Sequence, residues 1–148
     1  MPVGVPKVPF LMLDEFLINS LGGSVIDGIA IYDTIDTLLA PVETTAVGVA
    51  ASMACFILNG GTSRTAFPHA RVMMHQPSSS VSDVEMKELV LELQAIEKIR
   101  DCIIDGYRRT TFKSRTEITD ALEKDVFMSP IEAKEYRLID FIIGGGSL

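Results

Sequence analysis

The sequence predicts an α/β fold in a single domain over residues 1–148, and three observations support that prediction. The chain has 148 residues, 47% of them hydrophobic, and a chain of this length buries about two thirds of its unfolded surface. Strand-like and helix-like stretches alternate over the first half, which is typical of parallel strands joined by right-handed crossovers. No apolar run reaches the roughly 18 residues needed to span a bilayer.

Each element is identified from its periodicity and its ends. A helical period starts at Ser24, a good N-cap residue, and Pro41 ends it. A capping box is expected at Ser114–Glu117, and Ser129 precedes a proline at a first helical position. The expected elements are strands at Glu15–Asn19, Val42–Val47, Thr65–Phe67, Arg71–Met74 and Leu138–Ile143, and helices from Ser24 to Pro41, from Ser52 to Asn59, from Val81 to Phe112, from Ser114 to Lys124 and from Ser129.

The helix after Pro77 is expected to be unusually long. From about Val81 to Phe112, apolar residues recur at three/four spacing, and Arg100 interrupts the row. Because few globular helices exceed about 25 residues, part of this helix should project beyond the core. Two interpretations remain open, a surface helix that covers the sheet and a self-association arm.

Composition excludes several classes of function. The net charge of −7 argues against non-specific nucleic-acid binding, because a basic face is needed to neutralise phosphates. The two cysteines, Cys55 and Cys102, lie in apolar helical patterns, which predicts buried free thiols and no metal spacing. Residues 1–15 are expected to be extended, and they match neither a signal nor a transit peptide.

The stretch from Val47 to Leu58 has the pattern of a strand followed by a tight turn and a helix. Small residues flank Ser52 between a β-branched run and an apolar helical run, so the backbone can turn sharply there. A serine at a helix N-terminus is presented to backbone N–H groups and to the positive end of the macrodipole. That position suits an acyl-transfer nucleophile. The competing interpretation is a serine that only caps the helix.

A nucleophilic serine needs a base, an orienting carboxylate and oxyanion donors. Only His69 and His75 can be the base, and His75, at the end of a strand, is the better placed. Asp125 lies between two helices and could orient the base, or be a solvated acid at a helix end. The turn at Gly22-Gly23 could present N–H groups to an oxyanion or be an ordinary tight turn.

Five motifs in order resemble the Clp protease proteolytic-subunit family (ClpP). The resemblance covers about Phe16 to Ile142. The motifs are Asn19-Ser-Leu-Gly-Gly-Ser-Val25, Gly28-Ile-Ala-Ile-Tyr-Asp33, Ala50-Ala-Ser-Met53, Phe67-Pro-His-Ala-Arg-Val-Met-Met-His-Gln-Pro77 and Glu123-Lys-Asp-Val-Phe-Met-Ser129.

The resemblance implies a role for each candidate site residue. Ser52 would be the nucleophile, His75 the general base and acid, and Asp125 the residue that orients His75. Backbone N–H groups of Gly22 and Met53 would form the oxyanion hole. No cofactor and no metal are implied. The implied activity is that of a serine endopeptidase that works through an acyl-enzyme.

The resemblance also implies a fold and an assembly. The fold would be a ClpP/crotonase-like spiral of ββα units with a protruding handle helix. Subunits of this family form stacked heptameric rings, homo- or hetero-oligomeric, fed with unfolded proteins by an AAA+ unfoldase. The opening Met1–Phe10 resembles the plastid-encoded form, which implies the chloroplast stroma, with a bacterial cytoplasm as the alternative. No nucleic-acid or membrane partner is implied.

Several positions depart from the family pattern. Leu11–Glu15 alone bridges an interval of several tens of residues, so the first ββα unit is expected to be shortened. Leu21 replaces a proline, Ala54 a glycine and Lys124 an arginine. Two alternatives therefore stay open beside the peptidase. One is a catalytically impaired structural subunit of the ring, and a remote one is a crotonase-type acyl-CoA enzyme.

Overall fold

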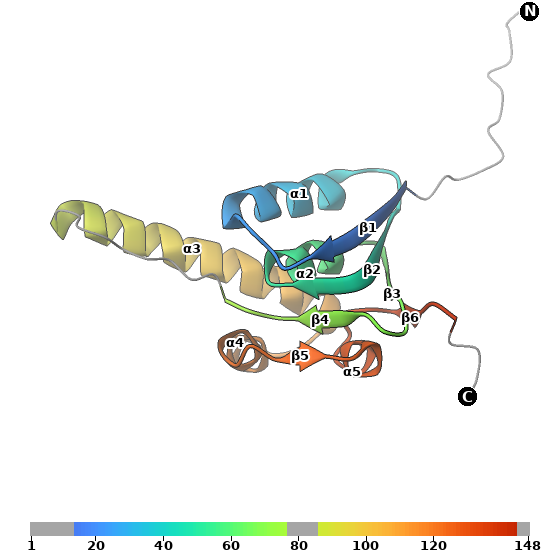
Figure 1. Cartoon of the computed structure of the whole chain (residues 1–148). Coiled ribbons are helices and arrows are strands. Elements are labelled where there is room, and N and C mark those ends of the chain that lie inside the picture. The colour runs from blue at the N-terminus through green and yellow to red at the C-terminus, as the bar shows by residue number, and fades with distance from the viewer. Residues whose placement is uncertain (1–13, 77–85, 145–148) are drawn as a thin grey trace, which may run out of the picture.

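The computed structural model describes residues 14–76 and 86–144 (Figure 1). Within these residues, six strands form one sheet that packs against helices, so the α/β prediction is confirmed. The strands are β1 (Asp14–Ser20), β2 (Val42–Ala51), β3 (Ser63–Ala66), β4 (Arg71–Met73), β5 (Phe127–Met128) and β6 (Phe141–Ile142). The helices are α1 (Val25–Thr37), α2 (Met53–Asn59), α3 (Met86–Thr111), α4 (Arg115–Glu123) and α5 (Pro130–Glu135).

Strand β2 is the centre of the sheet. One edge of β2 pairs in parallel with β1 along most of its length. The other edge pairs in parallel first with β3, through Glu43–Ala46, and then with β4, through Val49–Ala51. β6 continues the sheet beyond β3, and β5 joins β4 as an antiparallel pair. The carboxyl ends of β2 and β4 therefore lie side by side, and functional side chains gather at such an edge.

Strand β2 runs to Ala51, four residues beyond the predicted end at Val47. Gly48 has φ of +86°, and a Cβ there would lie 2.9 Å from Oδ1 of Asn19. The Val49 N–H donates to that same oxygen at 3.2 Å, and the register with β1 shifts at this point. Because glycine tolerates this conformation, β2 can form a bulge at Gly48 and continue as a strand to Ala51, the residue before Ser52.

The core is built around α2. Phe56 has no exposed surface and stacks on Tyr32, with ring centroids 4.2 Å apart, while Tyr107 meets it edge-on at 5.4 Å. A Cβ at Gly106 would lie 2.6 Å from the Phe56 ring, so α3 approaches α2 closely only because residue 106 is glycine. Stacked and edge-to-face pairs of this kind add to the hydrophobic gain, and they hold α2 rigidly behind the sheet.

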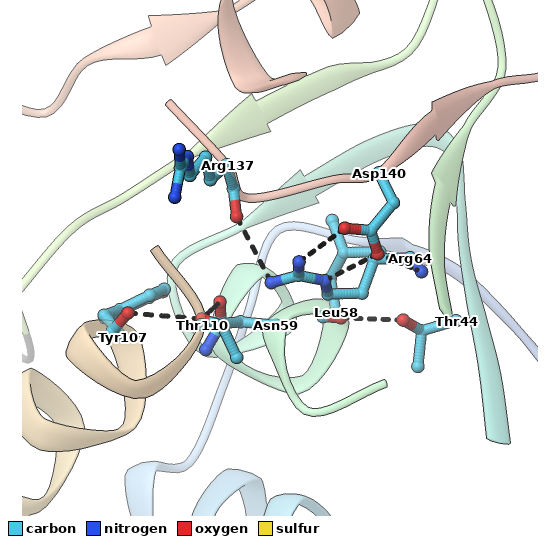
Figure 2. Close-up of polar contacts among 8 residues, drawn as sticks. All are labelled: Thr44, Leu58, Asn59, Arg64, Tyr107, Thr110, Arg137 and Asp140. Atoms are coloured by element: carbon cyan, nitrogen blue, oxygen red, sulfur yellow. Dashed lines mark hydrogen bonds and ion pairs between the residues drawn. The ribbon is translucent and has the colours of Figure 1, made fainter. Parts of the chain in front are cut away.

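A polar network fastens β3 to the C-terminal part of the chain (Figure 2). The Arg64 guanidinium donates to both carboxylate oxygens of Asp140, at 2.6 and 3.0 Å, and to the carbonyl of Arg137 at 3.2 Å. Nearby, the Thr44 hydroxyl donates to the Leu58 carbonyl, and the Asn59 side chain accepts from Thr110 (Figure 2). A bidentate pair with a further hydrogen bond satisfies a guanidinium that is almost fully buried.

Helix α3 extends from the sheet as a rod (Figure 1). Its C-terminal end packs on α2 and α4, in keeping with the expected long helix, whose first residues 81–85 lie outside the described residues. α4 and α5 both begin with a complete capping box, at Ser114 and Ser129. Those two helix starts are confirmed.

Other expectations need correction. Cys55 is buried but Cys102 is exposed on α3, because the helix presents residue 102 away from its packed face. The last strand covers only Phe141–Ile142 instead of Leu138–Ile143, because Leu138 and Ile139 turn into the core. β5, which the sequence analysis did not predict, begins two residues after Asp125.

The first thirteen residues lie outside the described part of the chain, so the shortened N-terminal unit stays a prediction. Strand β1 begins at Asp14, just inside the segment expected to be extended. Phe16 and Leu17 on β1 are 42% and 61% exposed, and Leu39, in the loop before β2, is fully exposed. Apolar side chains on β1 and in the loop before β2 are therefore exposed to solvent.

Candidate active site

Ser52 lies at the point where β2 ends and α2 begins. Its backbone has φ of 55° and ψ of −124°, a region that a non-glycine residue occupies only at some cost in energy. Its N–H donates to the Met73 carbonyl of β4 at 2.9 Å, and its carbonyl accepts from Cys55 and Phe56. The strained turn is therefore held from both sides, by the sheet and by the first turn of the helix. A serine on a sharp strand-to-helix turn is the geometry of a nucleophile elbow.

The Ser52 side chain makes no hydrogen bond to the first turn of α2. The interpretation of Ser52 as a side-chain cap is therefore wrong, although the residue occupies the N-cap position. Met53, the first residue of α2, is buried. Its N–H belongs to the helix start, where amide groups have no partner in the helix and the macrodipole favours negative charge.

Gly22 packs directly against this turn. Its φ is +103°, and a Cβ there would lie 2.8 Å from the Ser52 Cβ, 2.9 Å from the Ala51 carbonyl oxygen and 3.2 Å from the Met53 nitrogen. Only glycine fits such an approach. The backbone segments proposed as oxyanion donors, at Gly22 and Met53, are thus brought together beside the serine.

The Gly22 N–H already has a partner. It donates to the Ser20 hydroxyl at 3.1 Å, two residues earlier in the chain and exposed to solvent. A bound carbonyl oxygen would have to replace that hydroxyl. The sequence analysis did not single out Ser20, although a serine two residues before a turn glycine is a recognisable signal for this local hydrogen bond.

His75 follows β4 by two residues and is partly buried. Its Nδ1 is hydrogen-bonded to a carboxylate oxygen of Asp125, which stands between α4 and β5 with φ of 50°. The Gln76 N–H donates to the Leu122 carbonyl at 2.9 Å and joins the two segments that carry this pair. Asp125 is therefore more than a solvated acid at a helix end.

The candidate residues come together in two groups. Ser52, Gly22 and Met53 form one group, and His75 with Asp125 forms the other. The two groups follow neighbouring parallel strands, because Ala51 of β2 pairs with Met73 of β4. In the described part of the chain, no hydrogen bond joins the Ser52 hydroxyl to the His75 ring. Catalytic hydrogen bonds often tighten only when substrate binds.

His69 does not join either group. It is exposed in the turn that precedes β4, at the opposite end of that strand from His75. Over residues 14–76 and 86–144, no cluster of three histidine, cysteine or acidic side chains is arranged to hold a metal ion. No described helix is both long enough and apolar enough to cross a bilayer.

Comparison with known proteins gives a consistent assignment. Residues 15–145 match the family model described as Clp protease. A protein of Chaetosphaeridium globosum is 50% identical over 127 residues, which cover 84% of this chain and 63% of that protein. A Cuscuta gronovii protein is 46% identical over 129 residues (86% and 65%), and a Zea mays protein is 47% identical over 132 residues (87% and 61%).

All three relatives are named ATP-dependent Clp protease proteolytic subunit. The match spans between 61% and 65% of their length. The family-model match over residues 15–145 includes every candidate residue, from the turn at Gly22 to Asp125. This chain belongs to the Clp protease family.

Proposed function

We propose that the chain is a serine endopeptidase subunit that hydrolyses peptide bonds through an acyl-enzyme on Ser52. The observation that carries the proposal is the strained turn at Ser52, whose hydroxyl makes no capping hydrogen bond to α2. This turn lies beside β4, the strand that leads to His75, and His75 is hydrogen-bonded to Asp125. A strained backbone that the surroundings hold in place is a recognised mark of a functional residue.

In the proposed reaction, Ser52 attacks the peptide carbonyl while His75 takes the hydroxyl proton. The hydrogen bond from His75 Nδ1 to Asp125 holds the imidazole in the tautomer whose other nitrogen can accept that proton. The N–H groups of Gly22 and Met53 would donate to the oxyanion once the Ser20 hydroxyl has moved away. His75 then protonates the leaving amine, and water, activated by the same ring, releases the acyl group.

The proposed substrates and partners follow from membership of the Clp protease family. An ATP-driven unfoldase would supply unfolded polypeptides, and further copies or related subunits would complete stacked heptameric rings. We place the protein in a plastid, and more finely in the chloroplast stroma, because relatives with this name come from plants and green algae. No observation on the described residues favours the impaired subunit or the crotonase-type alternative.

A fluorophosphonate probe tests the chemistry directly. The purified chain, alone and with its ring partners, should be labelled at Ser52, and labelling should vanish in S52A and fall strongly in H75A. H69A is the matched control, because His69 is an exposed histidine at the other end of the same strand, and it should label like the unmodified chain. An unlabelled Ser52 in an assembled ring would refute the proposal.

A further inference from the structure

Arg100 interrupts the apolar row of α3, and the structure places its side chain at the end of α4. Its guanidinium donates to the Glu123 carboxylate at 2.8 Å. Glu123 is the last residue of α4, and Asp125 follows only two residues later. The projecting helix therefore touches the segment that carries the partner of His75.

The end of α4 carries charges of both signs, because the acidic Glu123 is its last residue and Lys124 is its C-cap residue. Its last turn contains no basic residue, while Glu123 adds a negative charge at the negative end of the helix macrodipole. Arg100 adds from α3 a second cation to the one that the C-cap Lys124 provides at this helix C-terminus, where positive charge is favourable. It also neutralises Glu123, whose carboxylate would otherwise repel the nearby carboxylate of Asp125.

The backbone conformation of Asp125 is unfavourable, so its position depends on the contacts of the neighbouring residues. Asp125 has φ of 50° directly after the helix, a position where glycine is the usual residue. Its side chain is 60% exposed, so packing does not hold it. Besides its own bond to His75, the segment is held by the backbone bond from Gln76 to Leu122, by the pairing of β5 with β4 and by Arg100.

We propose that Arg100 is a positioning residue for the His75–Asp125 pair, acting through Glu123 and the end of α4. The proposal rests on the proposed function, because it assigns Arg100 a role in the same site. Arg100 touches neither the nucleophile nor His75, and it acts by keeping the carboxylate of Asp125 aimed at Nδ1.

The chain offers a matched control. Arg115 pairs with Asp101, the residue next to Arg100, and so also joins α3 to α4. The two ion pairs are similarly exposed, with side-chain exposures of 40% and 50% for Arg100 and Glu123 and 53% and 55% for Arg115 and Asp101. The difference is position, because Arg115 begins α4, at the end remote from Asp125.

The test compares R100Q with R115Q in the full chain. Both variants are combined with ring partners in the same way as the unmodified protein. R100Q should lower the rate of fluorophosphonate labelling at Ser52 roughly tenfold, as expected for a small misplacement of a catalytic group. R115Q should stay within about twofold, because a surface ion pair contributes little. R100K should recover part of the rate, and the charge swap R100E/E123R should recover more. Equal rates in R100Q and R115Q would overturn the proposal.

A second readout needs no activity. The proton that His75 Nδ1 donates to Asp125 should give a downfield NMR signal that D125N abolishes. R100Q should shift or broaden that signal, and R115Q should leave it in place. If the fluorophosphonate probe did not label Ser52 in the unmodified protein, the peptidase proposal would be rejected. The effect of R100Q on the NMR signal would still decide whether Arg100 is a positioning residue. A signal identical in R100Q and the unmodified chain would reject that role alone.

Discussion

The two halves of the candidate site are held in opposite ways. The nucleophile turn is enclosed, since Ala51, Met53 and Ala54 are almost completely buried and Gly22, in the turn after β1, packs against its backbone. The half that carries His75 and Asp125 lies at the surface, with side chains 30% and 60% exposed. Packing holds the first half, and a few hydrogen bonds hold the second.

Because of this difference, substitutions in the two halves should have different effects on stability and on activity. Changes in the enclosed half should damage folding and activity together, because a close-packed interior transmits strain. Changes in the exposed half should affect activity while stability stays nearly constant. The exposed half also contacts a neighbouring element, because Arg100 of α3 pairs with Glu123 at the end of α4.

The largest expected effect is that of D125N on the exposed half. An amide cannot hold the His75 tautomer as a carboxylate does, so the rate of peptide hydrolysis should fall by about four decades. The melting temperature should hardly change, because the side chain is mostly exposed. Peptide hydrolysis and thermal unfolding, measured on one preparation, check both statements. A large drop in melting temperature would show that the surface half is a folding element after all.

The next effect is that of G22A on the enclosed half. The new Cβ would lie 2.8 Å from the Ser52 Cβ, at φ of +103°, so the turn must shift. Labelling at Ser52 should fall by about two to three decades, and the melting temperature should fall as well. G23A is the control, because nothing lies within 4 Å of a Cβ there. If both variants behaved alike, the close approach of Gly22 would have no consequence.

The smallest effect is expected for D140N, which removes the partner of Arg64. Burial by itself would raise the pKa of the Asp140 carboxyl, but the hydrogen bonds and charge of Arg64 outweigh it and lower that pKa overall. A lowered native pKa stabilises the fold above the unfolded value of 3.8, and the benefit disappears as the pH falls through the native pKa.

At neutral pH, D140N should therefore cost about 2 kcal/mol of unfolding free energy, because it leaves a buried guanidinium with one partner fewer. The difference from the unmodified chain should shrink on acidification. Denaturant unfolding at neutral and acidic pH measures it, and D101N in an exposed pair should cost under about 1 kcal/mol. An equal cost of D140N at both pH values would contradict the role of the ion pair.

Local patterns predicted the parts of the site that depend on local structure. The strand-to-helix turn at Ser52, the strand before His75 and both capping boxes follow from residues that are neighbours in sequence. The extension of β2 to Ala51 could not be predicted, because alanine and glycine have low strand propensity. The register with β4 and the bulge at Gly48 impose it.

Features that depend on contacts between residues far apart in the sequence could not be predicted. β5 has two residues, too few for any periodicity, and exists because β4 pairs with it. Arg64 and Asp140 are 76 residues apart, and neither belongs to a charge pattern. The exposure of Cys102 depends on which face of α3 meets the core. The choice of Asp125 among twenty acidic residues came from the resemblance alone.

The two cysteines differ enough to give the chain a built-in labelling site. Burial raises the pKa of the Cys55 thiol in α2 to about 12, so a thiol reagent has neither access nor thiolate there. Cys102 is exposed, although partial burial and the Asp33 carboxylate raise its pKa as well. A maleimide dye at mildly alkaline pH will therefore attach to α3 alone, two residues from Arg100. Fluorescence anisotropy can then follow the projecting helix without any cysteine being removed.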